Sequence, residues 1–247
     1  IVSQYSHERA VADGVNVAGE VWEINTRVTL EGAKLVQNQQ IEKREKLTRA
    51  RRWELQAEEE NYTGKELDQS VVNPDQIRTV IREYRDKWPE IFPGRQEVPK
   101  TLIFAKTDSH ATDIIEMVRT EFAESNDFCK KITYKTDDDP DTLLSRFRND
   151  YYPRIAVTVD MIATGTDVKP LEVVMFMRDV RSSNYFEQMK GRGTRTVDLE
   201  KLKSVTPSAI SAKTHYVIVD AVGVTKSAKT ASKPLINQPT IPLKDLA

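Results

Sequence analysis

The sequence predicts an α/β fold in which a parallel β-sheet is covered by helices on both faces. Short apolar runs between residues 100 and 220 have the length and composition of buried strands. Segments with helix-capping residues or helical periodicity separate these runs, and strands alternating with helices indicate a parallel sheet. With 38% hydrophobic and 30% charged residues among 247, the chain has enough apolar material for a sizeable core.

The N-terminal third precedes this alternation and has weaker patterns. Residues 15–30 alternate apolar and polar side chains, which predicts a hairpin or an edge strand. Residues 37–61 are dense in Lys, Arg, Glu and Gln, and we expect an exposed helix with many ion pairs. The alternative is a face that tracks phosphates. That face would use Lys43, Arg44, Arg49, Arg51 and Arg52.

A helix is predicted next, because Asn73 precedes Pro74 as a cap and apolar residues recur with helical spacing. We expect it to run to about Trp88 and to stop at Pro89. Its buried face would comprise Ile77, Val80, Ile81 and Tyr84. Residues 91–99 then form a turn-rich linker.

The strands of the sheet are expected at residues 101–105, 131–134, 155–159, 171–177 and 216–219. Ser109, Asp141 and the serines before Asn184 begin the helices between them. Ligands of such sheets gather outside the carboxyl ends of the strands. Those ends are followed by residues 106–108, 160–167 and 178–179. Residues 223–247 have little periodicity and predict an extended tail or linker.

The strongest chemical signal is the stretch from Gln188 to Arg195, which reads Gln-Met-Lys-Gly-Arg-Gly-Thr-Arg. If the preceding helix continues through it, Gln188, Arg192 and Arg195 lie on neighbouring turns of one side. Two guanidinium groups on one rigid surface suit a polyanion such as a triphosphate at its transition state. The alternative is a solvated basic helix end, where arginines favour the helix dipole.

A second signal is the loop at residues 160–167, which follows a predicted strand. Its threonines Thr164 and Thr166, with Gly165 between them, allow close backbone approach to a phosphate. Asp167 ends the loop. The loop and the arginines belong to consecutive strand–loop units, so both can reach one edge of the sheet.

Composition excludes several classes of protein. The net charge of -1 gives no global basic field, so contact with nucleic acid must be a local patch. One cysteine, Cys129, excludes a disulfide framework and indicates a reducing compartment, and three scattered histidines disfavour a zinc centre. No apolar run approaches the roughly 18 residues of a membrane span. Because the chain does not begin with methionine, we expect a fragment.

Three segments resemble motifs IV, V and VI of superfamily 2 helicases, in that order. They are residues 101–106 (Thr-Leu-Ile-Phe-Ala-Lys), 163–167 (Ala-Thr-Gly-Thr-Asp) and 188–195. The last fits Gln-x-x-Gly-Arg-x-x-Arg at every defined position. Residues 155–167 and 186–193 resemble more narrowly the restriction (R) subunit of type I restriction-modification enzymes. Residues 12–15 resemble the segment that leaves the first motor lobe of that family.

The resemblance implies a RecA-like lobe and a division of the chain into three parts. Residues 1–99 would be an inter-lobe linker with a hairpin and charged helices, residues 100–222 the second RecA-like lobe, and residues 223–247 a tail leading to another domain. In that family two lobes clamp ATP between them and move along double-stranded DNA, and a nuclease domain elsewhere in the subunit cuts it.

Residue roles follow from the same resemblance. The residues implied in catalysis are Arg192, Arg195 and Gln188. Those implied in nucleotide binding or in linking the motifs are Gly165, Asp167 and Gly191. Those implied in DNA contact are Lys106, Thr107, Thr158, Thr164 and Thr166. Val159 stands where helicases often have a phosphate-contacting threonine, and Thr158 lies beside it.

Cofactors and partners are implied in the same way. ATP and Mg²⁺ would be bound mainly by the first lobe, because this sequence has neither a phosphate loop nor an Asp-Glu run after an apolar strand. It also lacks a nuclease motif, so alone it should neither hydrolyse ATP nor cut DNA. The expected partners are double-stranded DNA, the first lobe and nuclease domain, and the methyltransferase and specificity subunits, in the bacterial cytoplasm and without a membrane.

Two other functions remain open on the sequence. The chain could be the C-terminal lobe of another superfamily 2 helicase or remodelling enzyme. It could also be a non-catalytic RecA-like module that docks partners through its charged segment.

Overall fold

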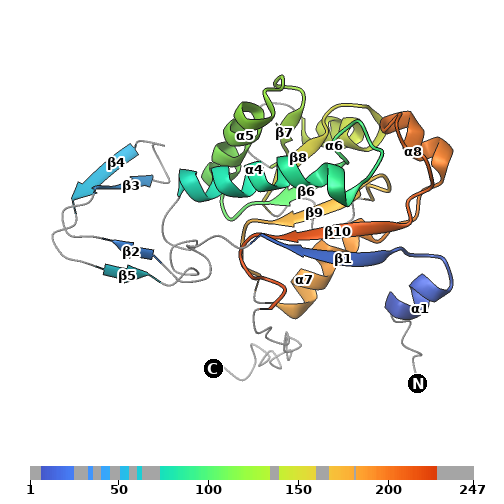
Figure 1. Cartoon of the computed structure of the whole chain (residues 1–247), viewed down its shortest axis with the longest axis horizontal. Coiled ribbons are helices and arrows are strands. Elements are labelled where there is room, and N and C mark those ends of the chain that lie inside the picture. The colour runs from blue at the N-terminus through green and yellow to red at the C-terminus, as the bar shows by residue number, and fades with distance from the viewer. Residues whose placement is uncertain are drawn as a thin grey trace, which may run out of the picture.

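The computed structural model describes residues 7–24, 33–35, 40–44, 51–55, 60–62, 73–133, 139–159, 167–180 and 182–226. Its centre is a six-stranded sheet in the order β1-β10-β9-β6-β8-β7, with every neighbouring pair parallel (Figure 1). The strands are β1 (Ala18–Glu23), β6 (Thr101–Phe104), β7 (Cys129–Lys131), β8 (Ile155–Thr158), β9 (Val173–Phe176) and β10 (His215–Asp220). The expected parallel α/β sheet is confirmed.

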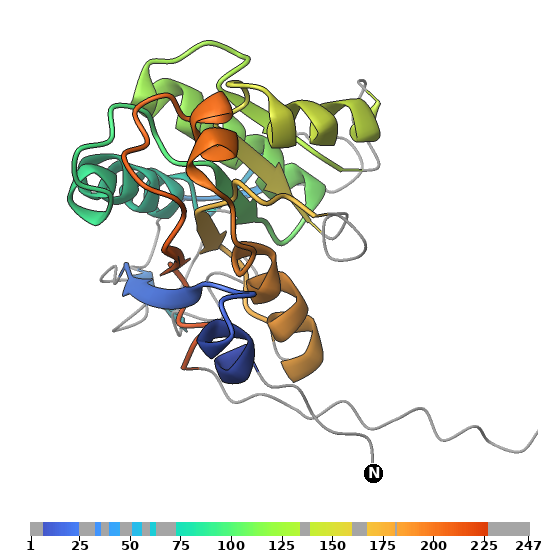
Figure 2. The same cartoon turned by 90° about the vertical axis from the view of Figure 1, so that its right-hand side faces the viewer.

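Helices cover both faces of this sheet. One face packs against α4 (Pro74–Ile91) and α5 (Asp108–Phe122), and the other against α6 (Pro140–Asn149) and α7 (Ser183–Lys190). Figure 2 shows the sheet edge-on between its two layers of helices, and α8 (Leu199–Val205) contacts α6, whereas α1 (His7–Ala12) precedes β1. None of the described helices is long and apolar enough to cross a membrane.

The two cores follow from the period of two in the strands. In β6, Ile103 belongs to the core under α4 and α5, whereas Leu102 and Phe104 belong to the core on the opposite face. The same division splits Val173 from Val174 in β9. Because both faces are buried, these strands read as continuous apolar runs, which is why the sequence predicted them.

The N-terminal third contributes directly to this body. β1 is an edge strand that pairs in parallel with β10, from Ala18 opposite His215 to Glu23 opposite Asp220. The edge-strand alternative for residues 15–30 therefore holds for β1. The sheet draws residues from both sides of the boundary expected at residue 100.

The helix expected over residues 37–61 is wrong. The structure has short antiparallel strands in this part of the chain, with β2 (Ala33–Leu35) paired to β5 (Glu60–Tyr62) and β3 (Gln40–Arg44) paired to β4 (Arg51–Leu55). The helix was inferred from charge content, which does not set a period. Trp53 and Leu55, two residues apart, already carry the period of a strand.

Several helix boundaries differ from expectation by a few residues. Asn73 caps α4 as predicted, but the helix runs two residues beyond Pro89, because a proline in the last turn removes only one backbone hydrogen bond. Thr107, not Ser109, caps α5, and Asp139, not Asp141, caps α6. In each case the capping residue lies two positions earlier than expected. α8 had no prediction.

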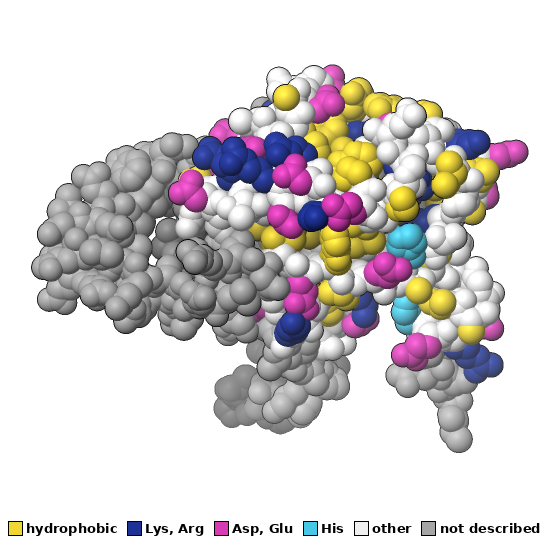
Figure 3. All heavy atoms as spheres, in the orientation of Figure 1, with side chains coloured by type: hydrophobic (Ala, Val, Ile, Leu, Met, Phe, Trp, Pro, Cys, Tyr) yellow, Lys and Arg dark blue, Asp and Glu magenta, His cyan; other side chains and the backbone are white. Residues whose placement is uncertain are grey.

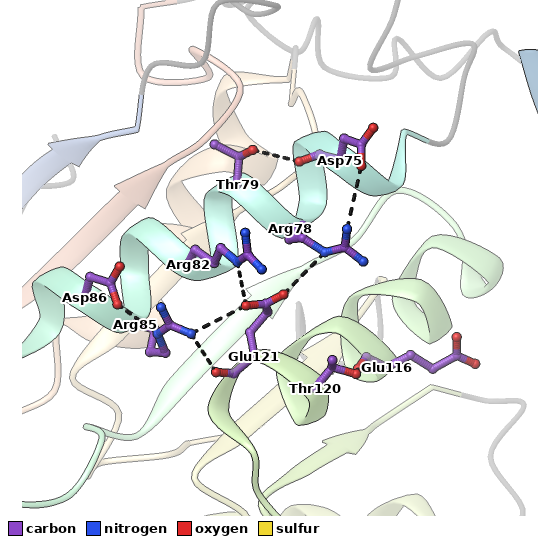
Figure 4. A network of polar contacts seen from close by, with 9 residues as sticks. All are labelled: Asp75, Arg78, Thr79, Arg82, Arg85, Asp86, Glu116, Thr120 and Glu121. Atoms are coloured by element: carbon purple, nitrogen blue, oxygen red, sulfur yellow. Dashed lines mark hydrogen bonds and ion pairs between the residues drawn. The ribbon is translucent and has the colours of Figure 1, made fainter.

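A cluster of arginines joins α4 to α5, and we call Arg78, Arg82, Arg85 and Glu121 the α4 cluster. The carboxylate of Glu121, only 6% exposed, lies 3.3 Å from Arg78 Nε, 2.7 Å from Arg82 Nε and 3.4 Å from Arg85 Nη1. Figure 4 shows the three guanidinium groups converging on it. In Figure 3 basic side chains stand out along α4, with acidic ones among them. The cluster therefore fixes α4 onto α5.

Candidate functional site

The candidate site lies around the turn that follows α7, where the sequence placed its arginines. Ser182 caps α7 by accepting a hydrogen bond from the Tyr185 amide at 3.3 Å, and the helix ends at Lys190. A 3₁₀ turn, Gly191–Gly193, comes next. Arg195 then forms an antiparallel bridge with Asn16.

The expectation that Gln188, Arg192 and Arg195 share one side of a single helix is therefore wrong. Glycines disfavour a continuing α-helix, so the chain tightens at Gly191 and then becomes extended. Gln188 is exposed on the last turn of α7, Arg192 lies half-buried in the 3₁₀ turn and Arg195 is exposed beyond it. The arginines are brought together by a turn and not by a helix face.

Packing from below fixes this turn. A Cβ atom built on Gly193 would lie 2.2 Å from the Tyr216 ring, and one built on Gly19 of β1 would lie 2.6 Å from the same ring. The ring of Tyr216, which is buried, thus contacts two glycine backbones at once. Gly191 differs, because none of the described residues has an atom within 4 Å of a Cβ built there. Only the second glycine of the turn is required by packing.

Asp167 joins the loop after β8 to the arginines. Its Oδ1 lies 3.6 Å from Arg195 Nε, with the two side chains 46% and 54% exposed. Burial lowers the pKa of Arg192, while the charge of Asp167 opposes this shift and the charge of Arg195 adds to it. Among the described residues, two guanidinium groups and one carboxylate therefore lie close together here, an arrangement that suits an anion. Hereafter Arg192 and Arg195 are called the arginine pair.

A segment near the start of the described chain lies beside the arginine pair. Val17 N donates to Thr194 O at 2.8 Å, and Thr196 Oγ1 donates to Val15 O at 3.5 Å. These contacts span about 180 residues, as Thr196 and Val15 lie 181 positions apart. Sequence reasoning missed them, although residues 12–15 resembled the segment that leaves the first motor lobe.

The other predicted site residues lie at the carboxyl edge of the sheet or next to it. Lys106 N donates to His110 Nδ1 at 3.3 Å, and Thr107 Oγ1 accepts from His110 N at 3.1 Å as the cap of α5. Both residues remain partly exposed. Thr164, Gly165 and Thr166 lie outside the described residues.

Thr158 does not fit its expected contact with DNA. It is the last residue of β8 and its exposed fraction is 0%. Its inward position in the sheet places the hydroxyl in the protein interior, where it has no hydrogen-bond partner among the described residues. The motif placed it near the DNA, but the strand faces it away from solvent.

Nucleotide chemistry fits these residues as one half of a site. The arginine pair and the open side of Gly191 can approach a phosphate, and arginines supplied from outside a nucleotide-binding lobe are a known way to stabilise phosphoryl transfer. Among the described residues, no group of three His, Cys, Asp or Glu side chains is placed to hold a metal ion.

The chain is similar in sequence to one domain family and to two proteins of known function. The helicase conserved C-terminal domain family matches residues 83–197. The type I restriction enzyme EcoKI endonuclease subunit of Escherichia coli (strain K12) is 28% identical over 256 residues, covering 99% of this chain and 20% of that protein. The EcoAI endonuclease subunit of Escherichia coli is 29% identical over 140 residues, covering 54% of this chain and 17% of that protein. The chain thus spans about a fifth of the length of these curated relatives.

One solved structure with a similar fold is the fragment of a putative HsdR subunit of a type I restriction enzyme from Vibrio vulnificus YJ016. The two sequences are 22% identical and the TM-score is 0.47. The match covers 63% of this chain and 30% of the Vibrio chain. The sequence matches therefore place a helicase conserved C-terminal domain at residues 83–197, and they make the chain similar over almost its whole length to the endonuclease subunit of a type I restriction enzyme.

Proposed function

We propose that this chain is the second motor lobe of an ATP-dependent double-stranded DNA translocase within a type I restriction endonuclease subunit. In this role Arg192 and Arg195 stabilise negative charge on the γ-phosphate of ATP held by a first lobe. Gln188 senses that phosphate or positions water. Asp167 ties the loop after β8 to the arginine pair.

The observation that carries this proposal is the placement of the arginine pair with Asp167. Arg195 is 54% exposed and its ion pair with Asp167 is long, at 3.6 Å, so its guanidinium keeps donors for an anion. Arg192 is half-buried in the 3₁₀ turn, next to Gly193, whose backbone packs against Tyr216. Guanidinium groups that are already in position can stabilise a charged transition state without a large reorganisation of the protein.

The nucleotide would be shared between two lobes. When bound, ATP with Mg²⁺ supplies the phosphoryl group to be transferred, and the first lobe would hold most of both. Gly191 and Gly165 would let the backbone approach the phosphates, and Asp167 would reach the ribose if it is not engaged by Arg195. The hydrogen bonds between residues 15–17 and 194–196 would couple the segment from the first lobe to the arginine pair.

Contact with DNA would use the carboxyl edge of the sheet. Lys106 and Thr107 follow β6, which lies between β8 and β9, and both are partly exposed. Their charge and hydroxyl suit a phosphate backbone, which is the part of DNA that a translocase can hold at any sequence. Thr164 and Thr166 would complete this contact. The nuclease domain and the methyltransferase and specificity subunits are the remaining proposed partners.

The test is the ATPase rate of the full-length protein with Arg195→Ala or Arg192→Ala, in the presence of its DNA. We expect kcat to fall about 10³-fold or more in each, because loss of an arginine finger costs this much. Arg82→Ala is the matched control, since Arg82 is 55% exposed against 54% for Arg195 but belongs to the α4 cluster. Its kcat should not change.

Near-normal hydrolysis in both arginine-pair variants would remove the proposed role. If ATP hydrolysis is lost in all three variants, with and without DNA, the substitutions have instead caused misfolding. Circular dichroism of each protein would detect this. A non-catalytic docking module predicts no ATPase effect in any variant.

A further inference from the structure

Lys213 is a buried lysine that the proposed function does not use. It precedes β10, and only 5% of the residue is exposed. Its ammonium Nζ donates to Gly193 O at 2.7 Å and to Lys169 O at 3.4 Å. Its backbone N donates to Val197 O at 3.1 Å. The side chain of Lys213 thus contacts two separate loops. Its backbone contacts Val197, two residues after Arg195.

Those two carbonyls belong to the two halves of the candidate site. Lys169 lies two residues after Asp167, and Gly193 lies between Arg192 and Arg195. A single ammonium therefore holds the loop that carries the carboxylate and the turn that carries the arginine pair. The 3.6 Å contact between Asp167 and Arg195 is exposed and loose, so it cannot set their separation alone. The buried ammonium of Lys213 can help to set it, because it donates to the Gly193 carbonyl at 2.7 Å and, by a longer contact of 3.4 Å, to the Lys169 carbonyl.

We propose that Lys213 is the positioning residue that fixes the arginine pair relative to Asp167 by bridging the Gly193 and Lys169 carbonyls. This inference rests on the proposed function, because it assigns Lys213 a role through Arg192 and Arg195. Lys213 itself does not reach the nucleotide, since its ammonium is enclosed beneath the turn.

The charge of Lys213 is sensitive to pH. Burial lowers its pKa to about 7, while the charges of Glu172 and Asp167 act in the opposite direction. Glu172, itself buried, is paired with Arg95 at 2.8 Å and also feels the charge of Arg154. As the pH rises through about 7, the ammonium becomes an amine and its hydrogen bonds lose their charge assistance. The bridge is therefore strongest on the acidic side.

The experiment is the kinetics of full-length protein with Lys213→Met, which keeps a long apolar stem but removes the donors. We expect kcat for ATP hydrolysis to fall about 10- to 100-fold with KM changed less than about threefold, because misplacement affects mainly the transition state. Lys203→Met is the matched control, because Lys203 is exposed on α8. It should behave as the unmodified protein.

A double variant separates positioning from a general effect on structure. If Lys213 acts through the arginine pair, adding Lys213→Met to Arg195→Ala should lower kcat by less than about twofold further, since the two changes remove one unit. Independent, multiplying losses would overturn the proposal. So would an unchanged kcat in the single Lys213→Met variant.

The pH profile provides a second arm should Lys213→Met not fold. In the unmodified protein kcat should decline as pH rises through about 7, and in Lys213→Arg that decline should disappear, because arginine stays charged. Identical profiles would overturn the proposal. If Arg192→Ala and Arg195→Ala hydrolyse ATP normally, the proposed function fails; if they are impaired while Lys213→Met and Lys213→Arg match the unmodified protein, only this inference fails.

Discussion

Two groups of arginines in this chain differ in how their charge is balanced. In the α4 cluster, three guanidinium groups surround Glu121, whose carboxylate is 6% exposed and within 3.4 Å of each. In the arginine pair, Arg195 meets Asp167 at 3.6 Å, and both side chains are about half exposed. The carboxylate of the first group is buried among its arginines, and the carboxylate of the second group is about half exposed.

The difference teaches how to separate structural arginines from candidate catalytic ones. A carboxylate buried between two helices uses the donors of its arginines for internal contacts, so the α4 cluster serves packing. An exposed carboxylate orients a guanidinium without occupying all of it. Arg82 and Arg195 have nearly equal exposure, at 55% and 54%, so exposure by itself does not distinguish them. The environment of the counter-charge does.

The largest effect we expect on stability tests what holds the arginine pair. Gly193→Ala should destabilise the turn and β10 by about 3 kcal/mol, because overpacking against a buried ring forces backbone shifts. A Cβ there meets the Tyr216 ring at 2.2 Å. Gly191→Ala is the control, because its Cβ would have no neighbour within 4 Å in the described part of the chain, and it should leave stability unchanged. Hydrogen exchange of residues 191–197 and 215–220 measures both. Equal protection in the two variants would mean that Tyr216 does not fix the turn.

A smaller effect is expected at the α4 cluster. Glu121→Ala should weaken the docking of α4 by about 2 kcal/mol, since three arginines lose a shared acceptor but can turn toward water. Glu116→Ala is the control, because Glu116 is exposed on the same helix. Hydrogen exchange in residues 74–91 gives the stability, and ATPase activity per folded molecule should remain normal. A selective loss of kcat would show that the α4 cluster also serves the motor.

The layers of the fold could be predicted from the sequence because parallel strands that are buried on both faces read as continuous apolar runs. The runs at β6, β8, β9 and β10 are apolar on both faces, so their burial could be inferred without knowing the topology. Residues 37–61 had no such signal, and charge content favoured a helix where the structure has strands. Local composition was enough in the core and misleading at the periphery.

The residues of the candidate site were chosen from the sequence and their roles stay a prediction, whereas their geometry was not foreseen. The spacing of Arg192 and Arg195 identified them, yet the helix assumed to carry them ends at Lys190, because two glycines follow. The contacts of Val17 with Thr194 and of Lys213 with Gly193 join distant segments. Such pairings depend on the assembled sheet, so no local pattern in the sequence contains them.

The smallest predicted effect concerns Asp167 and sharpens the comparison most directly. Asp167→Asn keeps a polar side chain of the same shape but removes its charge. If Asp167 orients Arg195 and does not neutralise it, this change should lower kcat by about tenfold, a much smaller loss than that of an arginine finger. The two side chains are about half exposed, so solvent screens their attraction and stability should not change. Raising the salt concentration should lower kcat in the unmodified protein toward that of Asp167→Asn and leave the variant unaffected, because only the former has a screened ion pair at this position. Equal salt dependence in both proteins would show that Arg195 is oriented by the backbone contacts of its turn, and the open counter-charge would then have no part in the site.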